Sequence, residues 1–501
     1  MKNQIKNRIV LISVVISCFS YVSFAQRMLS ANELQKDADL LKKSLEHFHS
    51  GLYRYISPEN FGKKFDDFEN KLNEPLTYGE FYKLISQLLS EINCSHTKLN
   101  PYNQKKEVRE NLFDRSVYFP FYFEIIDYSF VVTENASSQD LPRGSVITSI
   151  NGVPSKEIIL NLSSSTSSDG KGTMGHRIKS LEIDRFSGVE YPIFDLMFPL
   201  FYPLTNGVFE VEAINFSTNE KLSFVVPALA KDERTKKMEE RYGKTPSYDD
   251  GWKFEILEDN IGYIRLAHFL TWQLSFKKEE FFKNAFKEMQ KKQVKNLVID
   301  IRNSGGGDSG VYLEIFKYLF DNDLICNFPK KSLIRNTEAK PELAKYIQTY
   351  DKSVEYIIQN GVPSNFYSES DSGEFIVNEG GNCKLGKPYK NNFEGNVFIL
   401  VNSANTSASF AFAHYAKEYK IATLVGQETG GNVLGFNGGN FLFFYLPNSK
   451  FEFDIPLQAH YFSEKSIDSG VQPHYLITRT SADIGNGIDK EMEKVRELIK
   501  K

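Results

Sequence analysis

The stretch that decides the fold is VFILVNSANTSASFAFAHYA, residues 397–416. Its first five residues predict a buried strand, the polar NSANT predicts a tight loop, and the apolar run that follows predicts a helix. Ser407 stands in the first turn of that helix, where free backbone N–H groups and the helix dipole favour negative charge. The position suits a nucleophile, although an ordinary helix N-cap also explains a serine here, and Ser403 and Ser409 are alternatives.

A second informative stretch is NLVIDIRNSGGGDSG, residues 296–310. A buried strand ends in charged residues and runs into Gly305–Gly307, and glycines let the backbone approach a ligand and direct N–H groups at an oxyanion. The spacing also satisfies the G-x-G-x-x-G fingerprint of dinucleotide-binding enzymes. A dinucleotide site requires the glycines directly after the strand. Here the residues from Asp300 to Ser304 intervene, so the dinucleotide hypothesis is disfavoured.

A nucleophilic serine needs a base, and His96 in NCSHTKL, residues 93–99, is the best candidate among the eight histidines. It follows a helix predicted by the capping box of Thr77 and Glu80, and loops beyond helix ends commonly hold catalytic groups. A surface histidine is the alternative interpretation. Five other histidines fall on or near predicted helices and strands and are expected to be structural: His47, His49, His414, His460 and His474.

Composition excludes several classes of protein. The chain has 501 residues, 41% of them hydrophobic, and a formal net charge of −4 with both signs dispersed, so disorder and nucleic-acid binding are not expected. Residues 1–25 resemble an export signal, with cleavage after Ala25 favoured over a lipoprotein site at Cys18. No later apolar stretch is long enough to span a membrane. We therefore expect a periplasmic or cell-surface protein. The three remaining cysteines permit at most one disulfide.

The pattern along the chain predicts a mixed α/β, multidomain protein. Helical spacing marks an N-terminal domain over residues 26–105, and short alternating apolar runs mark a β domain over 106–230. From 251 to 501 strand-like and helical runs alternate, as in α/β domains, with a polar insertion at about 330–392. A charge-dense segment from Lys231 to Asp250 separates the last two parts.

Together these motifs resemble the tail-specific (C-terminal-processing) and tricorn-core serine peptidases. The matching stretches are IDIRNSGGG (299–307), NTSAS (405–409), LVGQETGG (424–431) and SGVQP (469–473), in the family's order. GSVITSINGVP (144–154) resembles the end of that family's PDZ-like domain. The resemblance implies a catalytic core of the ClpP/crotonase type, hydrolysis of peptides or unfolded protein tails, and no metal or organic cofactor.

The resemblance also assigns roles to individual residues. Ser407 matches the nucleophile, the N–H groups of Gly306 and Ala408 match the oxyanion hole, and Gly307 lies beside them. The processing-protease branch has a lysine where this chain has Asn432, so its Ser-Lys dyad is not possible here. The tricorn-like branch uses a histidine in a Ser-His stretch, which His96 resembles.

Two positions are left open by the resemblance. The family places a carboxylate that orients the histidine shortly before Gly-Val-x-Pro, where Glu464 and Asp468 are both candidates. His474 stands where the family usually has aspartate. Because the site departs from the family pattern, a catalytically inactive protein that binds peptides or hydrophobic ligands on the same fold is the alternative to a serine peptidase. The oligomeric state and cleavage specificity are not predicted.

Overall fold

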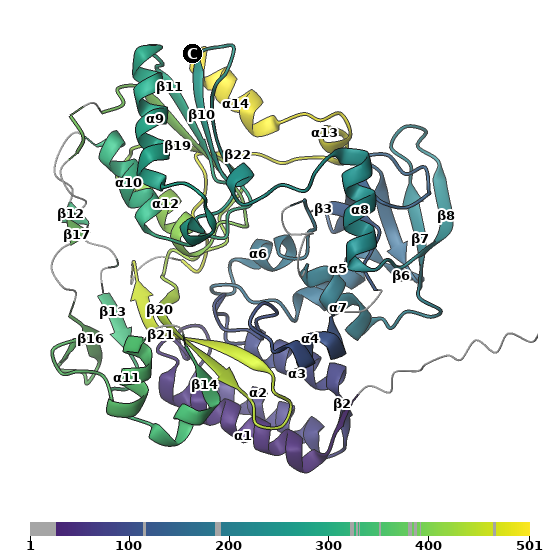
Figure 1. The fold of residues 1–501 in the computed structure, drawn as a ribbon, viewed down its shortest axis with the longest axis vertical. Helices are drawn as coiled ribbons and strands as arrows, with labels where there is room; N and C mark the ends of the chain where they lie inside the picture. Colours follow the sequence, from purple (N-terminus) through teal and green to yellow (C-terminus); the bar gives the residue numbers. More distant parts are fainter. Residues whose placement is uncertain are drawn as a thin grey trace, which may run out of the picture.

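The computed structural model describes residues 27–501 apart from 114–116, 186–191, 321–324, 327–328, 330, 350–351, 379–382, 385–387, 391 and 464–466. The predicted export signal, Cys18 and Glu464 therefore lie outside the described residues. Helices and sheets are combined in several packed parts (Figure 1), as the sequence predicts. Within the described range, no helix is both long and apolar enough to cross a membrane.

The N-terminal part is helical, and its helices begin where capping residues stand. Ser30 with Glu33, and Thr77 with Glu80, form complete capping boxes that satisfy otherwise free N–H groups at the starts of α1 and α3. The capping box predicted at Thr77 is confirmed. The elements of this part are β1 (Met28–Leu29), α1 (Ala31–Phe48), α2 (Pro58–Glu69), β2 (Leu76–Thr77), α3 (Tyr78–Ser90) and α4 (Lys106–Leu112).

The next part is built on an antiparallel sheet with the order β3-β4-β5-β7-β8, to which β6 adds beside β5. Its charge-dense helix α8 is not fully exposed, because Arg234 is buried and its guanidinium lies 2.7 Å from the Asp195 carboxylate. The elements are β3 (Phe121–Ile126), β4 (Ser129–Asn135), β5 (Val146–Ile150), β6 (Val153–Pro154), α5 (Ser155–Ser163), α6 (Met174–Lys179), α7 (Ile193–Phe201), β7 (Val208–Ile214), β8 (Lys221–Pro227) and α8 (Lys231–Tyr242).

A six-stranded sheet, ordered β22-β19-β18-β11-β10-β9, forms the α/β part. All neighbours are parallel except the edge pair β9 and β10. The elements are β9 (Trp252–Ile256), β10 (Ile261–Leu266), α9 (Lys278–Lys291), β11 (Asn296–Asp300), α10 (Gly310–Leu319), β18 (Asn396–Val401), α12 (Ser407–Glu418), β19 (Thr423–Gly426), β22 (Tyr475–Leu476), α13 (Ser481–Gly485) and α14 (Lys490–Ile499).

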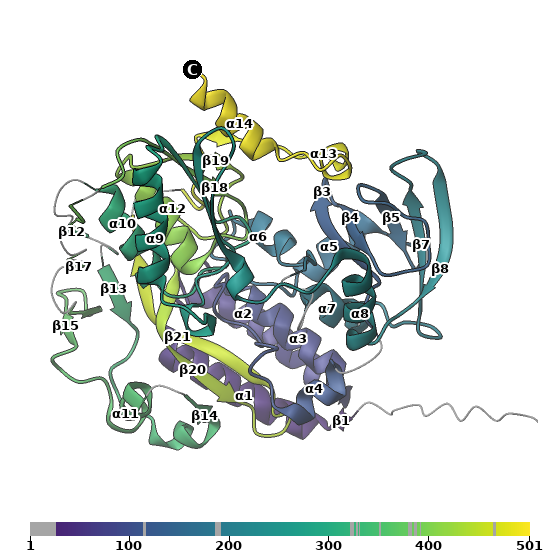
Figure 2. The same cartoon turned by 45° about the horizontal axis from the view of Figure 1, so that its top comes forward.

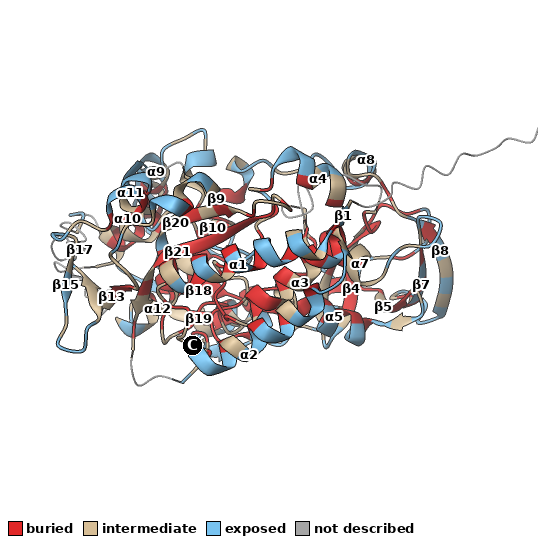
Figure 3. Ribbon diagram, turned by 90° about the horizontal axis from the view of Figure 1, so that it is seen from below, coloured by how far each residue is buried: buried red, intermediate tan, exposed pale blue. Residues whose placement is uncertain are grey.

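Both faces of this sheet are covered, which explains why its strands are continuous apolar runs. Ile299 and Ile399 belong to the core shared with α9, α10 and α12, whereas Val298 and Phe398 pack with α14 on the opposite face. Figure 3 shows the buried residues along β10 and β18. Because β11 and β18 are parallel neighbours, the loops after them emerge at the same edge of the sheet.

The polar segment expected as an insertion contributes strands to a third sheet, ordered β14-β20-β21-β13-β16-β15. Its long hairpin β20–β21 lies against α1 (Figures 1 and 2), and Phe444 and Phe453 join the N-terminal core. This hairpin is not predicted from the sequence. The elements are β12 (Ile325–Cys326), β13 (Lys331–Ile334), β14 (Ile347–Gln348), α11 (Lys352–Asn360), β15 (Tyr367–Glu369), β16 (Phe375–Val377), β17 (Cys383–Lys384), β20 (Asn437–Tyr445) and β21 (Glu452–Tyr461).

Candidate active site

The loops after β11 and β18 are joined by several side-chain hydrogen bonds. The Asn402 side chain donates to Asn303 Oδ1 at 2.7 Å and accepts from the Asn303 N–H at 3.1 Å. Three residues further along the same loop, Asn405 Nδ2 donates to the carbonyls of Ile301 and Ser304. The two motifs NSGGG and NSANTS therefore form one rigid unit at the edge of the sheet.

Ser407 occupies a strained position on this unit. Its φ of +50° lies in the left-handed region, which a serine adopts only where the surroundings impose it. The residue lines a large cavity, and within the described part of the chain its hydroxyl has no hydrogen-bond partner. Ser409 instead donates to the Ser304 carbonyl at 2.7 Å, and Ser403 donates to the Glu428 carbonyl at 3.1 Å. Of the three serines, Ser407 is therefore the one whose hydroxyl is available to a ligand.

The glycine loop lies directly against Ser407. Gly306 and Gly307 have φ values of +99° and +138°, which a residue with a side chain rarely adopts. A Cβ on Gly306 would lie 2.9 Å from the Ala408 nitrogen and 3.1 Å from Ser407 Cβ. The Ala408 N–H is in the first turn of α12 and has no carbonyl partner four residues earlier within the helix. The Gly306 N–H makes only a long contact of 3.4 Å to Ser304 Oγ.

Gly306→Ala is expected to lower kcat/KM by at least about 10²-fold, because the new methyl group would occupy the space beside the Ala408 N–H and Ser407. The positive φ should also cost about 1–3 kcal/mol of stability. Gly243→Ala is the matched control. Gly243 has a φ of +86°, but a Cβ there meets nothing within 4 Å. Thermal unfolding should show a loss of stability in both variants. Hydrolysis should show a loss of activity only in Gly306→Ala, and equal activity of the two variants would contradict this role for the loop.

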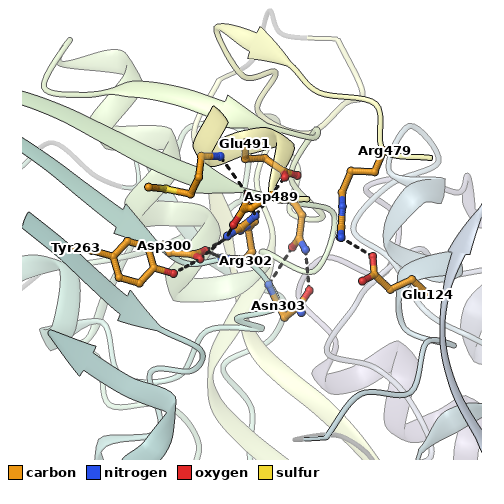
Figure 4. Close-up of polar contacts among 10 residues, drawn as sticks. Glu124, Tyr263, Asp300, Arg302, Asn303, Arg479, Asp489 and Glu491 are labelled. Atoms are coloured by element: carbon orange, nitrogen blue, oxygen red, sulfur yellow. Dashed lines mark hydrogen bonds and ion pairs between the residues drawn. The ribbon is translucent and has the colours of Figure 1, made fainter. Parts of the chain in front are cut away.

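An ionic cluster, in which Asp300 and Glu491 are buried, fixes the start of the glycine loop (Figure 4). The Arg302 guanidinium bonds both oxygens of Asp300, at 3.0 and 2.7 Å, and both oxygens of Asp489, at 2.9 Å. Its Nη1 also donates to Glu491 at 3.2 Å. Burial alone would raise the pKa of Asp300, but the guanidinium outweighs it and lowers the pKa. Asp489 and Glu491 come from the start of α14, so the C-terminal helix stabilises the loop that carries Gly306.

His96 is the base candidate that the structure places at the same cavity as Ser407. It lies in the loop after α3, and its Nδ1 is 3.2 Å from Ser95 Oγ. The Ser95 hydroxyl donates to Asp169 Oδ2 at 2.7 Å, and the Ser95 N–H donates to Asp169 Oδ1 at 3.0 Å. Asp169, which the sequence analysis did not single out, is therefore the carboxylate connected to His96 through one hydroxyl group.

This chain of contacts assigns the tautomer of His96. Ser95 has a single hydroxyl proton, and an ionised carboxylate can only accept, so that proton points at Asp169. The remaining lone pairs of Ser95 Oγ face His96, whose Nδ1 must then carry a hydrogen. Nε2 is left unprotonated, which is the form that can accept a proton from a nucleophile.

The pKa shifts agree with a neutral imidazole beside a buried acid. Burial lowers the pKa of His96 to about 3, and the positive charge of Lys98 adds to the shift. Burial raises the pKa of Asp169 to about 6, against the hydrogen bonds from Ser95. At pH 7 His96 is therefore neutral and Asp169 is mostly ionised.

Asp468, one of the two carboxylates predicted to orient His96, makes its contacts elsewhere. It accepts hydrogen bonds from the N–H groups of Lys171 and Gly172, both at 3.0 Å, and from Asn432 Nδ2 at 2.6 Å. Asn432 Nδ2 also donates to the Asp169 carbonyl at 2.9 Å. Asp468 and Asn432 thus hold the loop that presents Asp169. A Cβ on Gly172 would lie 1.7 Å from the Asp468 carbonyl, so the Asp-Gly-Lys-Gly sequence is required for this close approach.

The loop carrying Asp169 is also tied to the loop carrying His96. The Arg177 guanidinium donates to the Ser90 carbonyl at 2.7 Å, to Asn93 Oδ1 at 3.0 Å and to Ser168 Oγ at 2.9 Å. The Gly170 N–H donates to the Asn93 carbonyl at 3.0 Å. His474, the other departure from the family pattern, accepts a hydrogen bond from the Leu424 N–H and does not line the cavity.

Ser407 and His96 share a cavity of about 1430 Å³. It is lined by the glycine loop, the first three turns of α12, the loops after α3 and β10, and residues of β20 and β21. This is a suitable size for several residues of an extended peptide. Among the residues that the structure describes, no group of three or more His, Cys, Asp or Glu side chains is arranged to hold a metal ion.

The chain is similar to known proteins in sequence pattern and in fold. Residues 260–477 match the family model described as peptidase family S41. A point mutant of CPAF is 15% identical, with a TM-score of 0.64 over 93% of this chain and 97% of that chain. Mature CPAF complexed with lactacystin is 14% identical, with a TM-score of 0.62 over 94% and 98% of the two chains. At these identities the CPAF structures show a common fold. No curated protein matches the chain.

The matched segment contains the glycine loop, Ser407 and β22. The protein is a serine-type peptidase, a hydrolase that acts on peptides or proteins. Its residues 260–477 match the model of peptidase family S41, which confirms the family resemblance predicted from the sequence motifs.

Proposed function

We propose that the chain is an exported serine peptidase in which Ser407 is the nucleophile and His96 is the general base. The observation that carries this proposal is the chain of contacts from Asp169 through Ser95 to His96, at the cavity that Ser407 lines. Its substrates would be peptides or unfolded protein tails. The antiparallel sheet part would serve as a PDZ-like domain that adds a peptide strand to its edge.

In the first step His96 Nε2 takes the hydroxyl proton of Ser407 while Oγ attacks the peptide carbonyl. The imidazolium that forms has both nitrogens protonated, and its Nδ1–H stays bonded to Ser95. Because Ser95 is bonded to Asp169, the carboxylate stabilises the new positive charge through one intervening hydroxyl. His96 then gives the proton to the leaving amine, and water releases the acyl group by the same steps.

The negative oxygen of the tetrahedral intermediate would be held by the N–H groups of Ala408 and Gly306, with Gly307 shaping the loop. The start of α12 adds the positive end of a helix dipole. Such preorganised donors typically contribute on the order of 10² to 10³ in rate each.

Hydrolysis of fluorescently labelled casein tests the proposal. We expect the wild type to cut casein and His96→Ala to lose at least about 10²-fold in rate, since the base is removed. His474→Ala, which removes an exposed imidazole outside the cavity, is the matched control and should retain the wild-type rate. An inactive wild type that still binds casein would favour the alternative, a binding protein on the same fold. An active His96→Ala would exclude His96 as base.

A further inference from the structure

Beyond the nucleophile, the face of α12 that lines the cavity is apolar. Ser407, Ala411 and Tyr415 all line it, and they follow one another at the spacing of four residues that places side chains on one helix face. Ala411 lies about 6 Å along the helix from Ser407, and Tyr415 about 12 Å. The cavity thus extends from the nucleophile over a methyl group to an aromatic ring.

Aromatic rings from three other elements surround this strip. The Tyr415 ring lies 5.9 Å from Phe462, which follows β21, and 5.8 Å from Tyr312 of α10. Phe436, before β20, lies 5.6 Å from Phe462 and 5.9 Å from the His96 ring. The recess is therefore bounded by aromatic side chains from His96 to the far end of the strip.

The described lining of the cavity carries no negative charge. None of the described residues that line it is Asp or Glu, and Lys98 is the only Lys or Arg among them. Its four histidines, His96, His176, His268 and His460, all have their pKa lowered by burial and are neutral at pH 7. Transfer of an apolar side chain from water into this recess would therefore be favourable, whereas a charged side chain would lose its hydration.

We propose that Ala411 and Tyr415 form a specificity pocket for a large apolar, above all aromatic, side chain on the residue whose carbonyl Ser407 attacks. This rests on the proposed function. The carbonyl oxygen is placed at the Ala408 N–H, and the side chain one carbon away is then within reach of the next turn of α12. The side chain at 411 is a single methyl group that is 4% exposed, so it takes up little of the space beside Ser407. A larger residue at 411 would fill it.

Peptides that differ only in the residue before the scissile bond test the pocket, with Phe, Leu, Ala and Asp compared on the wild type, Ala411→Val and Ala411→Leu. We expect wild-type kcat/KM to be at least about 10²-fold higher for Phe than for Ala, and lowest for Asp. Ala411→Leu should lower kcat/KM for Phe by about 10²-fold and change that for Ala less than about threefold. Ala411→Val should fall between them.

A small fluorophosphonate that reports on Ser407 distinguishes the two proposals. If the probe labels the wild type and Ala411→Leu but all four peptides are cut equally, or if Ala411→Leu lowers all rates together, the specificity pocket is overturned while the peptidase stands. If the wild type is not labelled and cuts none of the peptides, the proposed function itself fails. Ala411→Val covers the case in which Ala411→Leu does not fold.

Discussion

Ser407→Ala is expected to lower the rate of casein hydrolysis by on the order of 10⁶, the size of effect found when the nucleophile of a serine peptidase is removed. The hydroxyl is the only atom lost, and within the described residues it bonds to no other group, so folding should not depend on it. The positive φ of +50° is kept, and alanine tolerates it about as well as serine does. Thermal unfolding should therefore agree with that of the wild type within about 0.5 kcal/mol.

Ser403→Ala is the control for this variant. Ser403 is in the same loop, but its hydroxyl donates to the Glu428 carbonyl, so its loss should cost about 1 kcal/mol of stability and little activity. A Ser407→Ala protein that cuts casein at the wild-type rate would remove Ser407 from the mechanism.

Asp169→Asn is expected to lower kcat by about 10³–10⁴ while leaving the protein folded. An asparagine at 169 can donate its amide hydrogens to Ser95 Oγ, and Ser95 would then donate to His96 Nδ1. The imidazole would hold the wrong tautomer, with its hydrogen on Nε2, as in the aspartate-to-asparagine change of a Ser-His-Asp triad. Asp468→Asn is the comparison, because Asp468 contacts the loop but not Ser95 or His96. A wild-type kcat for Asp169→Asn would show that the contacts from Asp169 through Ser95 to His96 do not contribute to catalysis.

The pH dependence of the wild type and of Asp169→Asn distinguishes the effect of Asp169 on catalysis from its effect on stability. In the wild type, kcat/KM should fall as the pH drops through about 6, where Asp169 takes up a proton. The contribution of Asp169 to the free energy of unfolding changes with pH in the opposite direction. The folded pKa of Asp169 lies above its unfolded value near 3.9, so its contribution is full below pH 4 and is lost as the pH rises through about 6. Asp169→Asn should therefore be relatively more stable than the wild type at pH 7, by on the order of 2–3 kcal/mol, and this advantage should vanish below pH 4.

Much of the α/β part could be predicted because its strands and helices carry strong local signals. The strand predicted at 397–401 coincides with β18, and the helix predicted after it coincides with α12, each within a residue or two. Adjacent parallel strands then bring the loops at Gly306 and Ser407 together at one edge. Periodicity and turn residues were sufficient for this part of the site.

The carboxylate could not be predicted in the same way. Asp169 lies in SSSTSSDGKG, which has the composition of an exposed linker, and it contacts Ser95 across 74 residues of sequence. The loop that carries it is held by Arg177, Asn432 and Asp468, which come from three different segments. The two glycines of Asp-Gly-Lys-Gly are the one local signal of a close backbone approach. The hairpin β20–β21 was missed for a similar reason, since its apolar residues pack on α1 nearly 400 residues earlier in the chain.

Intact-mass detection of labelling by a fluorophosphonate tests the central claim most directly, because only an activated serine reacts rapidly with it. The wild type, Ser407→Ala, His96→Ala and Asp169→Asn would be compared at pH 7.5. We predict one adduct on the wild type, none on Ser407→Ala, and strongly slowed labelling of the other two. Labelling of Ser407→Ala at the wild-type rate, or an unlabelled wild type, would contradict the account of Ser407 as a nucleophile activated by His96.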